Sequence, residues 1–202
     1  MCKAFPHNPK GVVVSCQVSY EIGMRKVFQR EAVRGLVRKN GKILMVHTKE
    51  GDYKFPGGGV EEKENHEEAL KREVLEETGL EIDDVYELIG QVIERREDQH
   101  DSSSVFEMVS YYYLCGGEKE LTKQNLIGYE IELDYKPYWL RPEEAFLNNL
   151  SIYRDDFPNR WLQRETEVLR FLLEESTEEN DENMSERGSG YEKTDQWNNL
   201  LE

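Results

Sequence analysis

The sequence predicts an α/β fold in which helices pack on the faces of one mixed β-sheet. Three observations support this prediction: two pairs of strand-like segments, a charged helix between the two pairs, and an amphipathic helix after them. Elements mixed in this way favour layers of helix and sheet around a common core. The chain has 202 residues, of which 37% are hydrophobic, so it can hold one domain of ordinary size with some additional sequence.

The first predicted strand pair flanks a tight turn. The segments from Glu31 to Arg38 and from Lys42 to His47 are rich in aliphatic residues. Asn40-Gly41 stands between them, and this dipeptide is a strong signal for a two-residue hairpin. Residues 1–28 form an N-terminal extension, in which one further strand is expected between Val12 and Tyr20.

The second strand pair and two helices complete the predicted elements. The strands are expected from Tyr86 to Glu94 and from Val105 to Leu114, with a polar linker between them. A short helix is expected from Pro142 to Asn148. The segment from Trp161 to Leu173 has apolar residues at helical spacing, which predicts a longer amphipathic helix.

The remaining residues, 174–202, form an acidic tail. Ten acidic and two basic residues give this segment a net charge of −8, which is half of the −16 of the whole chain. Such a polar segment has too little apolar surface to offset the entropy lost on ordering. The sequence therefore predicts that the tail is disordered.

Composition excludes several classes of partner. The net charge of −16 argues against a broad nucleic-acid surface, which would need clustered Lys and Arg. No apolar run approaches the length of a membrane span, so no membrane partner is expected. The cysteines, Cys2, Cys16 and Cys115, form no C-x-x-C pair and give no sign of a disulfide framework or a zinc site. A cytoplasmic location is therefore expected.

A charged helix with clustered carboxylates lies between the strand pairs. Asn65 can cap its start, and Gly79 can adopt the left-handed conformation that ends it. At about 100° per residue, Glu73, Glu76 and Glu77 converge on one face. An ordinary charged surface helix is the alternative interpretation, but it does not explain why Glu73 has apolar neighbours. A cation would offset the repulsion, and oxygen ligands favour Mg²⁺ or Mn²⁺.

The segment from Gly58 to Leu80 resembles the Nudix box. Gly58 is followed after five residues by Glu64, and after seven more by the sequence Arg72-Glu73-Val74-Leu75-Glu76-Glu77-Thr78-Gly79-Leu80. Every defined position of the motif is matched. With the flanking strand pairs and the C-terminal helix, the resemblance implies the family's α/β/α sandwich with a mixed sheet over residues 29–173.

The resemblance also implies a reaction: divalent-metal-dependent hydrolysis of a phosphoanhydride bond in a nucleoside diphosphate linked to another group. The metal ligands that it implies all come from the box and are Glu73, Glu76 and Glu77, with the Gly58 carbonyl and Glu64 as further candidates. Glu64 would bind a second metal or support the loop, and Arg72 would orient a box carboxylate. Bound metals would polarise the diphosphate and activate the attacking water.

A carboxylate outside the box would accept the proton of that water, as is frequent in the family. Glu107 is the first candidate because it interrupts the hydrophobic segment from Val105 to Val109. A partly exposed strand would give the same pattern. Asp98 and Asp101, in the preceding loop, are the alternatives.

The substrate is less well defined by the sequence. Lys54 and Arg34 are candidates for contacts to phosphates, with solvent-facing positions as the alternative. Some relatives that prefer ADP-ribose carry a proline downstream of the box, but none occurs between Leu80 and Lys136. Relatives that act on dinucleoside polyphosphates often carry a tyrosine after the box, in a region that Arg96, Glu97 and Asp98 occupy in this chain. These absences slightly favour MutT-like substrates such as nucleoside triphosphates. A catalytically inactive Nudix fold that senses ligands or binds partners is the alternative function, and the resemblance leaves a homodimer open.

Overall fold

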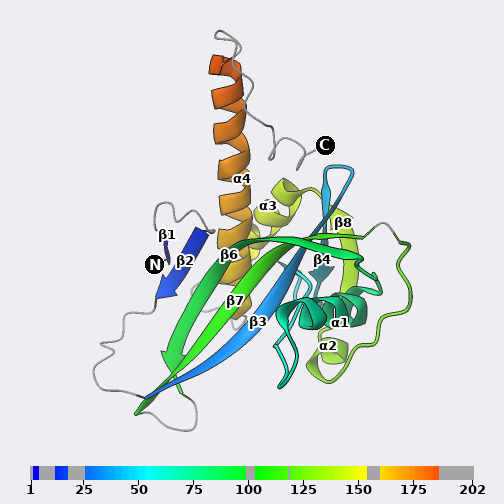
Figure 1. Ribbon diagram of the computed structural model, residues 1–202, viewed down its shortest axis with the longest axis vertical. Helices are drawn as coiled ribbons and strands as arrows, with labels where there is room; N and C mark the ends of the chain where they lie inside the picture. The colour runs from blue at the N-terminus through cyan, green and yellow to red at the C-terminus, as the bar shows by residue number, and fades with distance from the viewer. Residues whose placement is uncertain are drawn as a thin grey trace.

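A single mixed sheet with helices on both of its faces forms the body of the molecule (Figure 1). The computed structural model describes residues 2–4, 12–17, 26–98, 103–117, 119–153 and 160–186. In chain order, the elements are β1 (Cys2–Ala4), β2 (Val12–Gln17), β3 (Lys26–Lys39), β4 (Lys42–His47), β5 (Tyr53–Lys54), α1 (His66–Thr78), β6 (Asp84–Glu97), β7 (Ser104–Gly116), α2 (Tyr129–Glu132), β8 (Lys136–Leu140), α3 (Pro142–Ile152) and α4 (Arg160–Glu186).

The sheet contains both parallel and antiparallel pairs. Its order is β1-β2-β6-β7-β3-β4-β5, and β8 pairs with β4. β3 runs parallel to β7, with Lys26 opposite Ser104 and Val37 opposite Cys115. β6 and β7 are antiparallel, as expected for neighbouring strands joined by a short connection. The mixed sheet predicted from the sequence is thus confirmed.

The predicted hairpin and the second strand pair are confirmed as well. Asn40 and Gly41 have φ angles of 53° and 69°, the left-handed values that a two-residue turn of this kind requires. β6 and β7 are longer than predicted, because the paired strands take in both ends of the polar linker. A strand also forms in the N-terminal extension: β2 pairs with β6 in parallel.

The helices follow the predictions except at the C-terminus. α1 and α3 occur where they are expected, although α3 extends to Ile152. α4 does not end near Leu173 but continues to Glu186, so residues 174–186 are helical where the sequence predicts disorder. Glutamate is a good helix former, and a 2.8 Å ion pair between Arg170 and Glu174 supports the continuation. Residues 187–202 lie outside the described part of the chain.

Two hydrophobic clusters lie on opposite faces of the sheet and make the fold a three-layer sandwich. One contains side chains of the sheet, α3 and α4, including Leu36, Met45, Phe55, Tyr112, Ala145 and Leu169. The other joins the sheet to α1 and includes Val33, Val37, Leu44, Ala69, Leu70 and Val74. Burial of Ala69, Leu70 and Val74 fixes which face of α1 is turned inward. Among the described helices, none is long and apolar enough to cross a membrane.

Candidate active site

The ends of α1 are fixed by its capping residues. The side chain of Asn65 accepts a hydrogen bond of 2.9 Å from the backbone N–H of Glu68, whose carboxylate accepts one of 2.9 Å from the backbone of Asn65. This reciprocal capping box satisfies two N–H groups that a helix start leaves without partners. At the other end, Gly79 has a φ angle of 76° and donates its N–H to the carbonyl of Leu75. The predicted helix boundaries are therefore confirmed.

The glycine-rich loop before α1 runs along the edge of β3. The N–H of Gly35 donates to the carbonyl of Pro56 at 2.8 Å, and that of Val33 donates to the carbonyl of Gly58 at 2.9 Å. A Cβ atom at Gly58 would lie 2.3 Å from the carboxylate of Glu73, so any larger residue at this position would have to displace that carboxylate. The predicted metal ligand at Gly58, its carbonyl oxygen, already accepts one hydrogen bond and keeps a second lone pair.

Arg72 holds the acidic side chains of the box together. It forms a two-point ion pair with Glu64, with both N···O distances at 2.8 Å, and its guanidinium lies 2.7 Å from Glu73 and 3.3 Å from Glu76. Hydrogen bonds from Arg72 hold the pKa of Glu64 below its usual value. Arg72 is therefore placed to orient box carboxylates, and Glu64 is engaged with Arg72.

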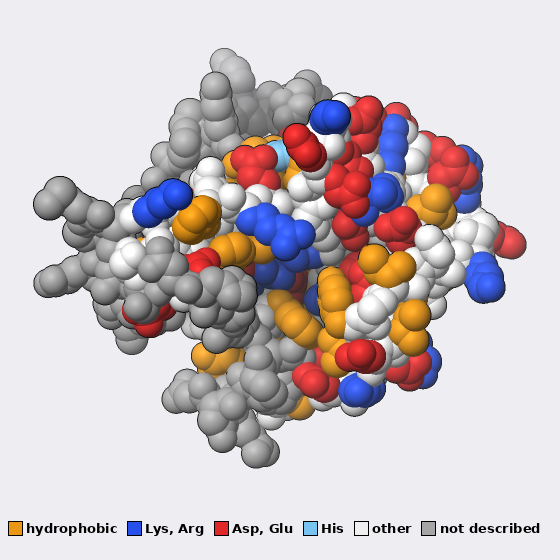
Figure 2. All heavy atoms as spheres, turned by 90° about the horizontal axis from the view of Figure 1, so that it is seen from below, with side chains coloured by type: hydrophobic (Ala, Val, Ile, Leu, Met, Phe, Trp, Pro, Cys, Tyr) orange, Lys and Arg blue, Asp and Glu red, His pale blue; other side chains and the backbone are white. Residues whose placement is uncertain are grey.

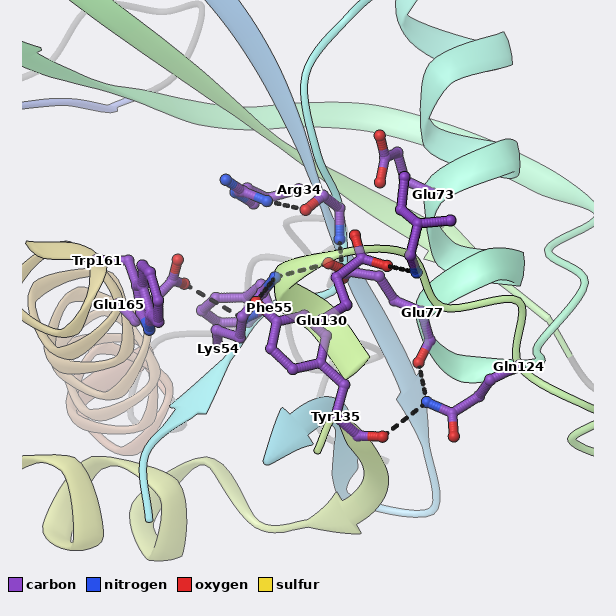
Figure 3. Close-up of polar contacts among 12 residues, drawn as sticks. Arg34, Lys54, Phe55, Glu73, Glu77, Gln124, Glu130, Tyr135, Trp161 and Glu165 are labelled. Atoms are coloured by element: carbon purple, nitrogen blue, oxygen red, sulfur yellow. Dashed lines mark hydrogen bonds and ion pairs between the residues drawn. The ribbon is translucent and has the colours of Figure 1, made fainter. Parts of the chain in front are cut away.

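Glu77 is buried against Lys54. Its carboxylate lies 2.6 Å from the Lys54 ammonium and accepts a 2.8 Å hydrogen bond from the backbone N–H of Gly57 (Figure 3). The Lys54 ammonium also donates to the Tyr135 hydroxyl at 3.1 Å. Burial lowers the pKa of Lys54, and the negative charge of Glu77 opposes this shift. β5 thus brings a cation to the carboxylate face of α1.

Arg34 lies in the same interior region. Its guanidinium donates a hydrogen bond to the carbonyl of Gly57, and its buried Nε has no hydrogen-bond partner within the described structure. Arg34 and Lys54 are both buried. The solvent-facing positions considered for these two residues are therefore wrong, because β3 and β5 turn both side chains inward.

A third carboxylate, which the sequence did not reveal, joins two of the box carboxylates. Glu130 of α2 meets Glu73 and Glu77 so that one carboxylate oxygen of each lies within 4.8 Å of the others. Glu130 is only 6% exposed, and burial raises its pKa and that of Glu73. Its side chain accepts a 3.0 Å hydrogen bond from the N–H of Ile127, and no described basic side chain forms an ion pair with it.

These three carboxylates, which we call the carboxylate group, suit a hard divalent cation. Mg²⁺ and Mn²⁺ prefer oxygen ligands, and several nearby carboxylates without a matching number of cations are costly when buried. The remaining predicted ligands lie at its border. Glu76 is outside the three mutually close oxygens, with 32% of its side chain exposed, and Glu64 is paired with Arg72.

Glu107 lies on β7 in a different environment. Its carboxylate accepts a 2.8 Å hydrogen bond from Gln29 of β3 and forms a 2.5 Å ion pair with Arg95 of β6. The structure thus joins Glu107 to the two neighbouring strands and not to the carboxylate group. Of the alternatives, Asp98 donates its backbone N–H to Ser104, and Asp101 lies outside the described residues.

Known proteins match this chain both in sequence and in chain path. The NUDIX domain family matches residues 29–158. An ADP-ribose pyrophosphatase of Methanocaldococcus jannaschii is 38% identical over 91 residues, which are 43% of this chain and 52% of that protein. The chain therefore spans about half the length of this curated relative.

Solved structures with a similar chain path include two bacterial proteins. A NUDIX hydrolase from Nitrosomonas europaea gives a TM-score of 0.48 at 18% identity, over 69% of this chain and 87% of that one. The E. coli ORF135 protein gives a TM-score of 0.43 at 25% identity, over 64% of this chain and 84% of that one.

Proposed function

Because this chain belongs to the Nudix family, we propose that it is a divalent-metal-dependent pyrophosphohydrolase. Its substrate would be a nucleoside diphosphate linked to a further group, and the bond cleaved would be a phosphoanhydride. The observation that carries this proposal is the carboxylate group, in which Glu73, Glu77 and Glu130 present oxygens within 4.8 Å of one another.

The roles of the chain's own residues follow from their contacts. Glu73, Glu77 and Glu130 would hold Mg²⁺ or Mn²⁺, which would supply Lewis-acid polarisation of the phosphoanhydride and a water of lowered pKa. Arg72 orients Glu73 from one side. The ammonium of Lys54 holds Glu77 from the other, so both carboxylates are fixed before any ligand arrives.

Other box residues would contribute at the border of the group. Glu76 would supply a further carboxylate to metal or water, since Arg72 leaves it partly exposed. The carbonyl of Gly58, which accepts one hydrogen bond from Val33, would be a further oxygen ligand through its second lone pair. Arg34 is proposed to contact phosphate through its guanidinium, whose Nε has no partner in the described structure. Lys54 would act on phosphate mainly through the field of its charge, because Glu77 and Tyr135 take two of its three donors.

One face of the molecule is chemically mixed, and such a surface would suit a substrate with charged and apolar parts. Figure 2 shows Lys and Arg side chains gathered at the centre of one face, with acidic side chains on one side and hydrophobic ones on the other. Phosphates are attracted by such a basic centre. Apolar neighbours are typical of sites that also bind a nucleoside.

Two substrate classes, ADP-ribose and nucleoside triphosphates, each have one observation in their favour. The relative from Methanocaldococcus jannaschii is named for ADP-ribose and is 38% identical over the matched residues. The absence of proline between Leu80 and Lys136 favours nucleoside triphosphates of the MutT-like class. Both contain a phosphoanhydride that the same carboxylate group would act on.

A substrate panel tests the proposal directly. The full chain is assayed with ADP-ribose and with nucleoside triphosphates, in Mg²⁺, in Mn²⁺ and in EDTA. We expect hydrolysis that EDTA abolishes and added metal restores. AMP with ribose phosphate would identify the first substrate class, and pyrophosphate with a nucleoside monophosphate would identify the second. Tight binding of either ligand with no hydrolysis in any metal would instead support a ligand sensor.

A further inference from the structure

The segment before α2 is hydrogen-bonded to the C-terminal end of α1. Thr122 donates both its backbone N–H and its hydroxyl to the carbonyl of Gly79, each at 2.7 Å. The backbone N–H of Asn125 donates to the carbonyl of Glu76 at 2.9 Å. The last carbonyls of a helix have no partners within it, so these contacts complete the end of α1.

Gln124 forms hydrogen bonds that connect α1 to the residues after α2 as well. Its side-chain amide donates to the backbone carbonyl of Glu77 at 2.5 Å and to that of Tyr135 at 3.0 Å. Figure 3 shows the amide lying between these two carbonyls. Gln124 precedes Glu130 in the chain and Tyr135 follows it, so one amide ties both flanks of α2 to the box helix.

The position of the Glu130 carboxylate depends on contacts outside its own helix. Glu130 lies on a helix of only four residues, and a helix this short is only marginally stable on its internal hydrogen bonds alone. Its backbone carbonyl accepts a 3.2 Å hydrogen bond from the N–H of Tyr135, the residue whose carbonyl Gln124 holds. The two box carboxylates on α1 have Arg72 and Lys54 to fix them, whereas Glu130 has no ion pair to a described residue.

We infer that Gln124 is a positioning residue that sets the carboxylate of Glu130 opposite Glu73 and Glu77. The inference rests on the proposed metal-binding role of the carboxylate group. It assigns Gln124 no contact with substrate or metal, because its amide donors are directed at two backbone carbonyls.

The test compares Gln124→Met with Asn125→Ala in the full chain. Gln124→Met keeps the length of the side chain but removes both donors. Asn125→Ala removes an exposed side chain from the same segment, while the backbone contact to Glu76 stays. Substitution of a residue that orients a metal ligand typically lowers metal affinity or activity by about 10–100-fold. We expect a loss of that size in Mn²⁺ affinity for Gln124→Met, measured by calorimetry without substrate, and no change for Asn125→Ala.

A double-mutant cycle separates positioning from a general loss of stability. If Gln124 acts through Glu130, Gln124→Met should weaken Mn²⁺ binding no further in a Glu130→Gln background. Full additivity of the two losses would overturn the inference, as would wild-type Mn²⁺ affinity in Gln124→Met. Should Gln124→Met fail to fold, Gln124→Asn, whose shorter amide cannot span both carbonyls, is measured in the same way. Failure of the wild-type chain to bind Mn²⁺ would contradict the proposed function itself, which is a separate result.

Discussion

Lys54 and Glu77 form an ion pair of 2.6 Å between side chains that are 5% and 1% exposed. Lys54 belongs to β5 and Glu77 to the last turn of α1, so the pair joins the box helix to the sheet across the interior. A buried charge is costly unless a partner offsets it, and here each residue is that partner for the other. The pair thus holds one proposed metal ligand in place, and the stability of the fold depends on the same contact.

We predict that Glu77→Gln abolishes activity and also destabilises the protein. Turnover should fall by at least about a hundredfold, because a ligand of the carboxylate group is lost. Loss of one partner of a buried ion pair costs roughly 3 kcal/mol or more, because the other charge stays buried. For a chain of this size the melting temperature should fall by roughly 6–12 °C, measured by thermal unfolding without metal.

Two further variants serve as controls for this prediction. Glu76→Gln should also lose at least about a hundredfold in turnover, but its carboxylate is partly exposed, so its melting temperature should stay close to that of the wild type. Lys54→Met combined with Glu77→Gln should recover much of the stability without activity. Wild-type turnover in either single variant would contradict the metal-ligand assignment.

A second prediction concerns the two neighbouring glycines of the loop. Gly58→Ala should weaken Mn²⁺ binding by about 10–100-fold, because its Cβ would lie 2.3 Å from the Glu73 carboxylate and displace it. Gly59→Ala is the matched control. Its Cβ would meet only the flexible end of Arg30, at 2.7 Å, and that side chain can move away. Equal Mn²⁺ affinities in the two variants would show that Gly58 does not shape the carboxylate group.

The sequence was most informative where structure is determined locally. The capping of α1 by Asn65 and its end at Gly79 depend on residues within a few positions of each other. The same is true of the turn at Asn40-Gly41. The convergence of Glu73 and Glu77 follows from helix geometry alone. These features could therefore be predicted without knowledge of the fold.

Contacts between distant segments could not be predicted in this way. Lys54 and Glu77 are 23 residues apart, and Gln124 and Glu77 are 47 apart. Glu130 lies in no recognisable motif, and only the packing of α2 beside α1 brings it to the carboxylate group. The burial of Arg34 and Lys54 likewise depends on which face of β3 and β5 is covered, which an isolated segment does not reveal.

The thiol of Cys115 gives a third prediction, about reactivity and pH. Burial raises the pKa of Cys115 to about 12 from an ordinary value near 9. The folded protein therefore keeps this thiol protonated between these two values, while the unfolded chain loses the proton. The contribution of the Cys115 thiol to the free energy of unfolding should be fully present below pH 9 and should decline as the pH rises toward 12. Iodoacetamide at pH 8 should label Cys115 only after denaturation, as read by peptide mass spectrometry. Rapid labelling of the native protein would contradict its burial.

A fourth prediction concerns the acidic end of α4. The helix packs on the sheet and α3 through residues such as Leu162, Leu169 and Leu172. We expect that deletion of residues 176–202 leaves hydrolysis and the melting temperature unchanged, because the segment is rich in charge and poor in apolar residues. A chain that ends after Leu169 is the contrasting control and should be destabilised. A large loss of activity in the longer chain would show that the C-terminal segment contacts the domain.

The last prediction separates two carboxylates outside the box, Glu130 and Glu107. Glu130→Gln should weaken Mn²⁺ binding by about 10–100-fold, because it replaces a charged oxygen ligand in the carboxylate group. Glu107→Gln should leave Mn²⁺ affinity unchanged, since its carboxylate is shared between Gln29 and Arg95. The Glu107 carboxylate is engaged by side chains of β3 and β6 and lies outside the carboxylate group, so we expect the turnover of Glu107→Gln to stay near the wild-type value. The main effect of Glu107→Gln should be a loss of roughly 1–3 kcal/mol in stability, from the broken ion pair with Arg95.

Stopped assays across pH 5–9 and an Mn²⁺ titration of each variant give the comparison. A 10²–10⁴-fold loss of turnover in Glu107→Gln, with a flattened acidic limb of the pH profile and intact Mn²⁺ binding, would instead identify Glu107 as the proton acceptor predicted from the sequence.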